Sequence, residues 1–216
     1  SFSVFQYLTL RSMVSAMKAL LLSLIIGPMF IAKLSRQQIA QKVRADGPKT
    51  HLSKDGTPTM GGGLIIVVIT ITTLFWGDLT NRYIWLVLSV TCAFGLIGWL
   101  DDYLKIRRQS SDGLAARWKI FWQTFVALSV SFYLYATADM AAQTDLIVPF
   151  FKEVALPLGL GFILFSALML VGMSNAVNLT DGLDGLAILP TVMVGGGLGL
   201  IAYLVGNSEH SFYLQI

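Results

Sequence analysis

The chain has 216 residues, of which 55% are hydrophobic and only 12% are charged, and its formal net charge is +3. A soluble globular domain carries about 25% charged residues, so this composition argues against a soluble protein and indicates one embedded in a membrane. The single cysteine, Cys92, lies within an apolar run. It has no partner for an internal disulfide, and a buried thiol is expected.

Six apolar runs of roughly 17 to 22 residues are long enough to cross a bilayer as helices. They cover residues 12–32, 60–76, 83–100, 118–137, 156–177 and 186–205. The first run contains Lys18 and lacks a clear small-residue cleavage site, so we interpret it as a span rather than a signal peptide. The sequence therefore predicts an all-α, multi-pass membrane protein with one membrane domain over residues 1–216, rather than a large soluble helical core. Residues 146–151 fit a helix, a strand or a loop at the outer face.

Basic residues are concentrated after the first and third runs. They are Lys33, Arg36, Lys42, Arg44, Lys49 and Lys54 in the first loop, and Lys105, Arg107, Arg108, Arg117 and Lys119 in the third. The positive-inside rule places loops one, three and five on the cytoplasmic face and both termini of the chain on the other. Topology and attraction to anionic lipid headgroups would by themselves explain such a basic surface.

The first loop combines turn residues with a cation. Gly56 and Pro58 favour turns, and Thr59 is expected to cap the second run. The amino end of that helix, with Lys54 beside it, would suit an anion such as a phosphate. A turn followed by a small-residue packing face explains the same pattern equally well.

Two adjacent carboxylates, Asp101 and Asp102, follow the third run and are expected at its carboxyl end. There they would repel each other and the helix dipole, and a hard divalent cation such as Mg²⁺ would compensate them. The alternative is pairing with Lys105 or Arg107 at helical spacing. Further along, Arg117 and Lys119 precede the fourth run and suit either anion binding or interfacial anchoring.

The stretch NAVNLTDGLDGLA, residues 175–187, places polar side chains every third residue between two apolar runs. Such spacing suits a helix end that unwinds at Gly182 and Gly185, because residues 175 and 184 would point in opposite directions on one continuous helix. Irregular backbone at membrane depth needs a polar cavity or a protein environment, and carboxylates there are functional candidates. A structural network of capping hydrogen bonds is the alternative.

The stretches GTPTMGG, DDYLK, GLAARWK and NAVNLTDGLDGLA, in this order, resemble the bacterial phospho-N-acetylmuramoyl-pentapeptide transferases, a family of polyprenyl-phosphate N-acetylhexosamine 1-phosphate transferases. The resemblance covers essentially the whole chain. It implies an inner-membrane enzyme of peptidoglycan synthesis that moves phospho-MurNAc-pentapeptide from its UDP carrier to undecaprenyl phosphate, giving lipid I and UMP. It also implies Mg²⁺ as cofactor, surrounding membrane lipid and compatibility with a homodimer, and no nucleic-acid partner is expected.

The resemblance also implies roles for particular residues. Asp101 and Asp102 match the catalytic pair: either Asp101 deprotonates the lipid phosphate for direct attack, which we favour, or Asp102 forms a covalent phospho-enzyme. The implied contacts to the nucleotide sugar or its diphosphate are Lys54, Thr57, Lys105, Lys119 and Asn178. The implied uridine side of the pocket is Asp181, Gly182, Leu183 and Asp184, with Asp184 reading the base. Asn178 is the implied metal ligand, with Asp181 behind it.

The family fold has roughly ten spans, and a site grafted on a fold must be complete to act. A further aspartate, expected to be the main metal ligand, and a histidine-rich motif would lie beyond Ile216. We therefore expect this piece alone to be inactive. Three alternatives stand beside this hypothesis: a sister enzyme that uses UDP-GlcNAc, a transporter or flippase, and a lipid-binding scaffold without chemistry.

Overall fold

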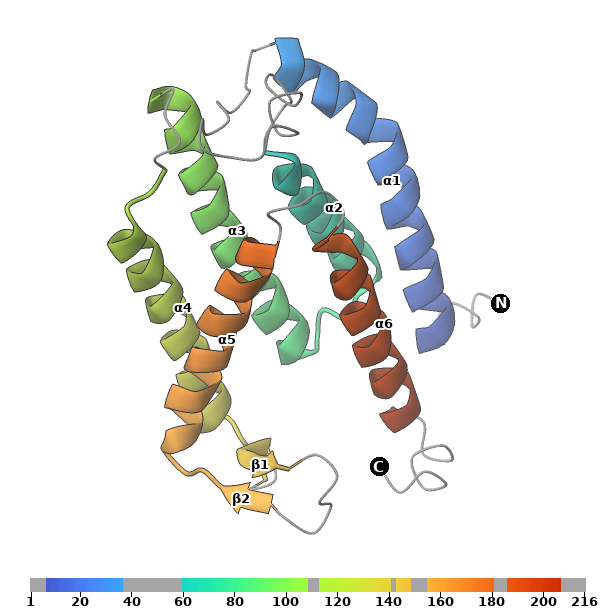
Figure 1. Ribbon diagram of the computed structural model, residues 1–216. Coiled ribbons are helices and arrows are strands. Elements are labelled where there is room, and N and C mark those ends of the chain that lie inside the picture. Colours follow the sequence, from blue (N-terminus) through green and yellow to red (C-terminus); the bar gives the residue numbers. More distant parts are fainter. Residues whose placement is uncertain are drawn as a thin grey trace. The chain divides into compact units, whose positions relative to one another are not determined.

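The computed structural model describes residues 7–36, 60–108, 113–140, 143–148, 155–180 and 186–206. Its helices are α1 (Leu8–Arg36), α2 (Gly61–Trp76), α3 (Arg82–Arg108), α4 (Ala116–Ala136), α5 (Gly161–Thr180) and α6 (Ile188–Val205) (Figure 1). Each of the six predicted apolar runs overlaps one of these helices. The chain separates into two compact units, residues 1–168 and 169–216, with the boundary inside α5.

Four of the described helices, α1, α3, α5 and α6, are long and apolar enough to cross a membrane. Helix α2 is apolar but has only 16 residues, and α4, with 21 residues, is not in that set. The predicted all-α membrane class is therefore confirmed. A helix forms within the region of each of the six predicted spans, and four of these helices are long and apolar enough to cross a membrane.

In the first unit, α1 packs on α2, α2 on α3, and α3 on α4. The small buried core includes Val68 of α2, Leu88 and Ile97 of α3, and Ala127 of α4. Small side chains such as Ala127 let membrane helices approach closely, and close approach supplies van der Waals packing where no hydrophobic effect drives helices together.

A short antiparallel hairpin follows α4. Strand β1 (Asp145–Ile147) pairs with β2 (Ala155–Pro157), with Leu146 opposite Leu156. The interfacial run that fitted a helix, a strand or a loop thus begins as a strand. Its remaining residues, from 149 onward, lie outside the described part of the chain.

In the second unit, α6 has no buried residue, and large apolar side chains are exposed along it. A helix that is apolar around its whole circumference is typical of a segment surrounded by lipid or by other membrane helices.

Three predicted helix ends are wrong. The fifth run was expected to be helical from residue 156, but residues 155–157 form strand β2 and α5 begins at Gly161. Helix α2 begins at Gly61 with Met60 at its N-cap, in a left-handed conformation (φ 74°) and without a side-chain capping hydrogen bond; the N-cap is therefore not Thr59. Helix α3 does not end at Leu100 but continues to Arg108. The apolar run marks where the membrane core ends, whereas the helix ends where its hydrogen bonds and side-chain pairs stop.

Candidate active site

The two adjacent carboxylates lie two turns inside the carboxyl end of α3, because the helix continues past the apolar run. The prediction that Asp101 and Asp102 lie at the helix terminus is therefore wrong. The helix continues because Lys105 lies four residues after Asp101 and three after Asp102, and pairs at both spacings stabilise a helix.

Lys105 bridges the two aspartates. Its Nζ lies 2.7 Å from Asp101 Oδ2 and 3.1 Å from Asp102 Oδ1. The Asp101 side chain is 14% exposed, Lys105 20% and Asp102 37%. The alternative of an ion pair with Lys105, predicted from helical spacing, is therefore observed, and one cation compensates two neighbouring anions.

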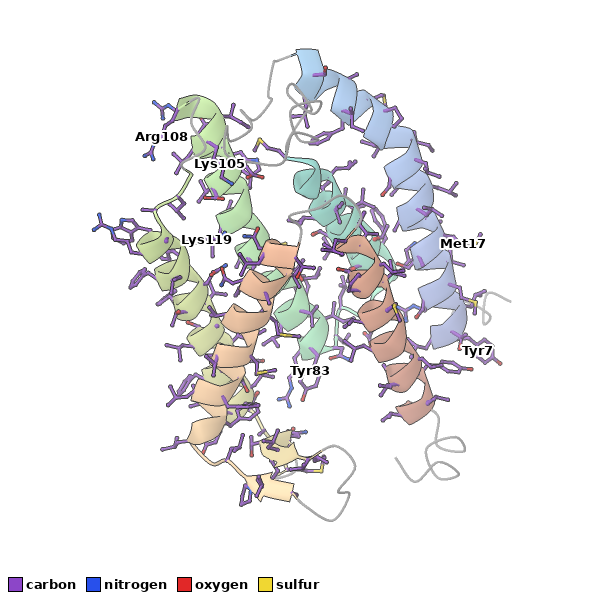
Figure 2. The ribbon with its side chains drawn as sticks, in the orientation of Figure 1. Tyr7, Met17, Tyr83, Lys105, Arg108 and Lys119 are labelled. Atoms are coloured by element: carbon purple, nitrogen blue, oxygen red, sulfur yellow. The ribbon has the colours of Figure 1, made fainter. Side chains whose placement is uncertain are left out.

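The segment that leads into α4 returns to the same carboxylate. The backbone N–H of Leu114 donates to Asp101 Oδ1 over 2.7 Å. One residue earlier, the Gly113 carbonyl accepts from Arg108 Nη1 over 3.3 Å. Figure 2 shows Lys105, Arg108 and Lys119 at this end of α3 and at the start of α4. Lys105 of α3 and Leu114 of the segment before α4 thus bond to the same carboxyl group.

The two aspartates are consequently unequal. Both oxygens of Asp101 accept hydrogen bonds, one from Lys105 and one from Leu114. Among the described residues, Asp102 accepts from Lys105 through Oδ1, and its side chain is the more exposed of the two. Asp101 is therefore held in one orientation, while Asp102 is better placed to meet a ligand.

Lys119 lies in the first turn of α4, where the N–H groups of Trp118 and Lys119 both bond to the Ala115 carbonyl. Ala115 is the N-cap and provides no side-chain capping bond. A helix amino end combined with a basic side chain has the electrostatics that anion binding requires. Arg117 and Lys119 thus occupy the position predicted from sequence.

The remaining predicted residues lie either in the second unit or outside the described part of the chain. Asn178 lies on α5 in the second unit, where Asn175 Nδ2 donates to the Val171 carbonyl over 2.8 Å. Helix α5 is regular through Thr180. The predicted residues outside the described part of the chain are Lys54, Thr57, Asp181, Gly182, Leu183 and Asp184.

A divalent metal suits the chemistry of Asp101 and Asp102, since Mg²⁺ prefers carboxylate oxygens. Among the described residues, however, no group of three or more His, Cys, Asp or Glu side chains comes together. Asp101 and Asp102 alone could supply only two carboxylate groups to such an ion, and the side chain of Asp102 is the more exposed of the two.

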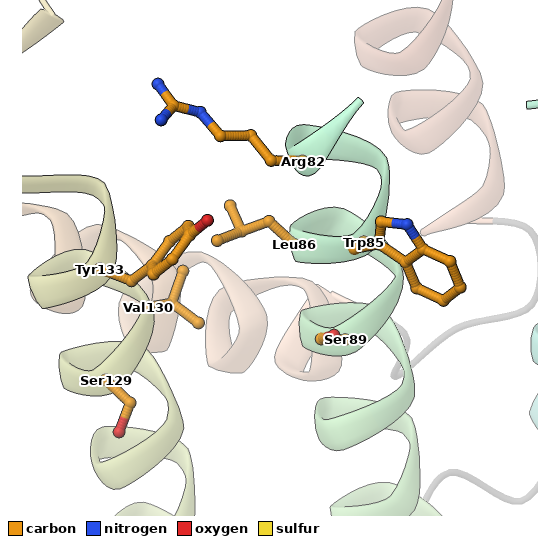
Figure 3. A pocket seen from close by; sticks show the side chains of 7 residues that line it. All are labelled: Arg82, Trp85, Leu86, Ser89, Ser129, Val130 and Tyr133. Atoms are coloured by element: carbon orange, nitrogen blue, oxygen red, sulfur yellow. The ribbon is translucent and has the colours of Figure 1, made fainter. Parts of the chain in front are cut away.

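A separate pocket of about 300 Å³ lies between α3 and α4 and contains none of the predicted site residues. Its walls include Leu86, Val130 and Tyr133, with Arg82 above them in the first turn of α3 (Figure 3). Because Arg82 begins α3 and Asp101 lies near its other end, this pocket is not part of the carboxylate site.

The fold and this site define a membrane-embedded protein with a carboxylate pair, a bridging lysine and a basic helix amino end. Residues 84–216, more than half of the chain, match the model of glycosyl transferase family 4. The chain belongs to this family, which places it among the polyprenyl-phosphate hexosamine 1-phosphate transferases. The protein is accordingly a glycosyl-phosphate transferase.

The sequence predicted a role for GLAARWK only through its two cations, Arg117 and Lys119. It did not predict the contact that the first two residues of the stretch make with Asp101. Gly113 and Leu114 touch Asp101 through backbone atoms. The available signal was Gly113, which lies three residues before α4 begins and close in sequence to the carboxylate pair.

Proposed function

We propose that the full-length protein transfers phospho-MurNAc-pentapeptide from UDP to undecaprenyl phosphate, forming lipid I and releasing UMP. The observation that carries this proposal is the group formed by Asp101, Asp102, Lys105 and the start of α4, in a chain of the matching transferase family. Both substrates are anionic and one is a lipid, so a site with cations at the end of membrane helices fits them. The setting is peptidoglycan synthesis at the cytoplasmic face of the bacterial inner membrane.

In the proposed reaction, an oxygen of undecaprenyl phosphate attacks the phosphorus bonded to the sugar. The phosphoanhydride bond to UMP breaks, UMP leaves with the bonding electrons, and a new phosphoanhydride joins lipid and sugar. Phosphoryl transfer depends mainly on positioning and charge stabilisation. Lys105 and Lys119 would supply positive charge to the diphosphate, and Asp101 would accept the proton from the lipid phosphate. The alternative remains a covalent phospho-enzyme on Asp102, whose greater exposure supports it.

Bound Mg²⁺ would neutralise charge on the transferred phosphate and the leaving group. Asp102 is its proposed ligand on α3, with Asn178 and Asp181 as proposed ligands from the second unit. The nucleotide side would be formed by Lys54, Thr57, Gly182 and Leu183. Asp184 would read the uracil, since a carboxylate can accept from its N–H group.

The test is release of UMP from UDP-MurNAc-pentapeptide and undecaprenyl phosphate by the full-length protein in detergent, with and without Mg²⁺. Asp102→Asn should abolish turnover, and chelation of Mg²⁺ should do the same reversibly. Asp184→Ala should mainly weaken nucleotide-sugar binding.

The outcome separates the competing functions. Turnover with UDP-GlcNAc in place of the muramoyl substrate would assign the protein to the sister enzyme. No turnover of either nucleotide sugar would contradict the proposal. Full activity of Asp102→Asn would remove the carboxylate pair from the mechanism.

A further inference from the structure

The segment that leads into α4 approaches Asp101 so closely at Gly113 that no room is left there for a side chain. A Cβ added at Gly113 would overlap Asp101 Oδ1, and would lie 2.8 Å from the Asp101 carbonyl oxygen and 2.9 Å from its carboxyl carbon. Real Cβ atoms essentially never come within 3.0 Å of such atoms. The neighbours are backbone and a carboxylate already held by two donors, so neither can move aside cheaply.

Two hydrogen bonds to α3 hold this segment in place. Leu114 donates its backbone N–H to Asp101 Oδ1 over 2.7 Å, while the Gly113 carbonyl accepts from Arg108 over 3.3 Å. One peptide segment is thereby tied to α3 at two points, and the following residues begin α4. Because Lys105 occupies the other oxygen of Asp101, the carboxylate cannot rotate without losing a short hydrogen bond.

We propose that Gly113 and Leu114 form a backbone cradle that sets the orientation of Asp101, and that Gly113 is a positioning residue of the active site. The inference rests on the proposed function for its catalytic consequence, but the cradle is a property of the protein that can be measured without substrate. It adds to the aspartate pair two residues that contribute only backbone atoms. Neither carries a side chain of obvious chemical use.

The first measurement is hydrogen exchange of the Leu114 amide in the full-length protein. The amide should exchange slowly in the wild type and markedly faster in Asp101→Ala, since the acceptor is gone. Asp102→Ala is the matched control: it removes the neighbouring carboxylate and should leave the exchange of Leu114 unchanged. Equal exchange in the wild type and Asp101→Ala would overturn the cradle, whether or not the protein turns over any substrate.

The second measurement is turnover. Gly113→Ala should lower kcat about 100-fold, because displacing a reacting group by about 1 Å has effects of that size, with little change in KM for the nucleotide sugar. Gly98→Ala is the control: it makes the same change on α3, where an added Cβ meets nothing within 4 Å, and kcat should stay within about twofold. Leu114→Pro, which lacks the N–H donor, should lower kcat as Gly113→Ala does.

A double-mutant cycle distinguishes positioning from a general loss of structure. In an Asp101→Asn background, Gly113→Ala should lower activity little further. Gly113 acts by orienting the Asp101 carboxylate, and that carboxylate is absent in this background. Additive losses, or wild-type turnover by Gly113→Ala, would overturn the proposed role. If the wild type turns over neither UDP-MurNAc-pentapeptide nor UDP-GlcNAc, the proposed function fails, and the exchange experiment alone then decides whether the cradle exists.

Discussion

Lys105 is the cation on which both site carboxylates depend. Replacing it with alanine leaves Asp101 and Asp102 adjacent and uncompensated, and hydrogen bonds to charged groups contribute about 1.5–3 kcal/mol each. We expect Lys105→Ala to lower the free energy of unfolding by about 1–3 kcal/mol and UMP release by about 100-fold. Thermal unfolding and turnover of the same preparation measure both.

Lys105→Arg is the matched variant, because it keeps the positive charge and several donors. It should retain most of the stability and part of the activity. If Lys105→Ala unfolds and turns over like the wild type, the bridge observed between the two aspartates has no energetic role.

Among the contacts of individual residues, the sequence alone predicted those that depend on local spacing. The Lys105 pairs follow directly from positions three and four residues apart on a helix. The Leu114 bond to Asp101 spans thirteen residues and depends on how the connecting segment turns. No pattern in the sequence specifies that path, so the backbone donor could not be predicted.

The helices themselves were predictable, and their ends were not. Apolar length identifies a membrane span because the hydrocarbon core is about 30 Å thick. It gives no information on polar turns that continue a helix into the headgroup region. Helix α3 extends beyond Leu100 because its charged residues pair along the helix. Helix α2 begins at Gly61 after Met60, whose side chain makes no capping hydrogen bond, so the usual capping signal does not mark its start.

A cationic clamp joins α1 to the carboxyl end of α2. Arg11 donates through Nε and Nη2 to the Trp76 carbonyl, at 3.0 and 2.5 Å, and Lys18 Nζ lies 4.3 Å from the centre of the Trp76 ring. A cation at a helix carboxyl end is favoured by the helix dipole. Arg11→Ala should therefore destabilise the protein by about 1–2 kcal/mol, measured as a lower midpoint of thermal unfolding in detergent.

Ser12→Ala is the control for this clamp, because Ser12 bonds only to the Leu8 carbonyl of its own helix among the described residues and should be neutral. Arg11→Lys keeps the charge with a different donor geometry and should fall between the two. An unchanged midpoint for Arg11→Ala would show that the α1–α2 contact does not need the clamp.

For the whole molecule, the distribution of basic residues among the loops predicts how the protein is oriented in the membrane. The basic residues that end α3 indicate the cytoplasmic side, and the turn at residues 78–81 that precedes this helix would then face the opposite side. Helix α3 has 27 residues, which corresponds to about 40 Å and exceeds the hydrocarbon thickness. The two ends of this one helix should thus lie in different aqueous compartments.

The lone cysteine makes this orientation directly testable. In a Cys92→Ser background, a hydroxyl replaces a thiol that lies 3.6 Å from Thr70 Oγ1, a contact that serine can keep. Cysteines are then introduced singly at two exposed positions, Thr80→Cys before α3 and Arg107→Cys in its last turn. A membrane-impermeant maleimide should label position 80 in intact cells and position 107 only after the inner membrane is permeabilised. The reverse pattern would place Asp101 and Asp102 on the outer face, where UDP-linked substrates are absent, and would contradict the proposed function together with the orientation.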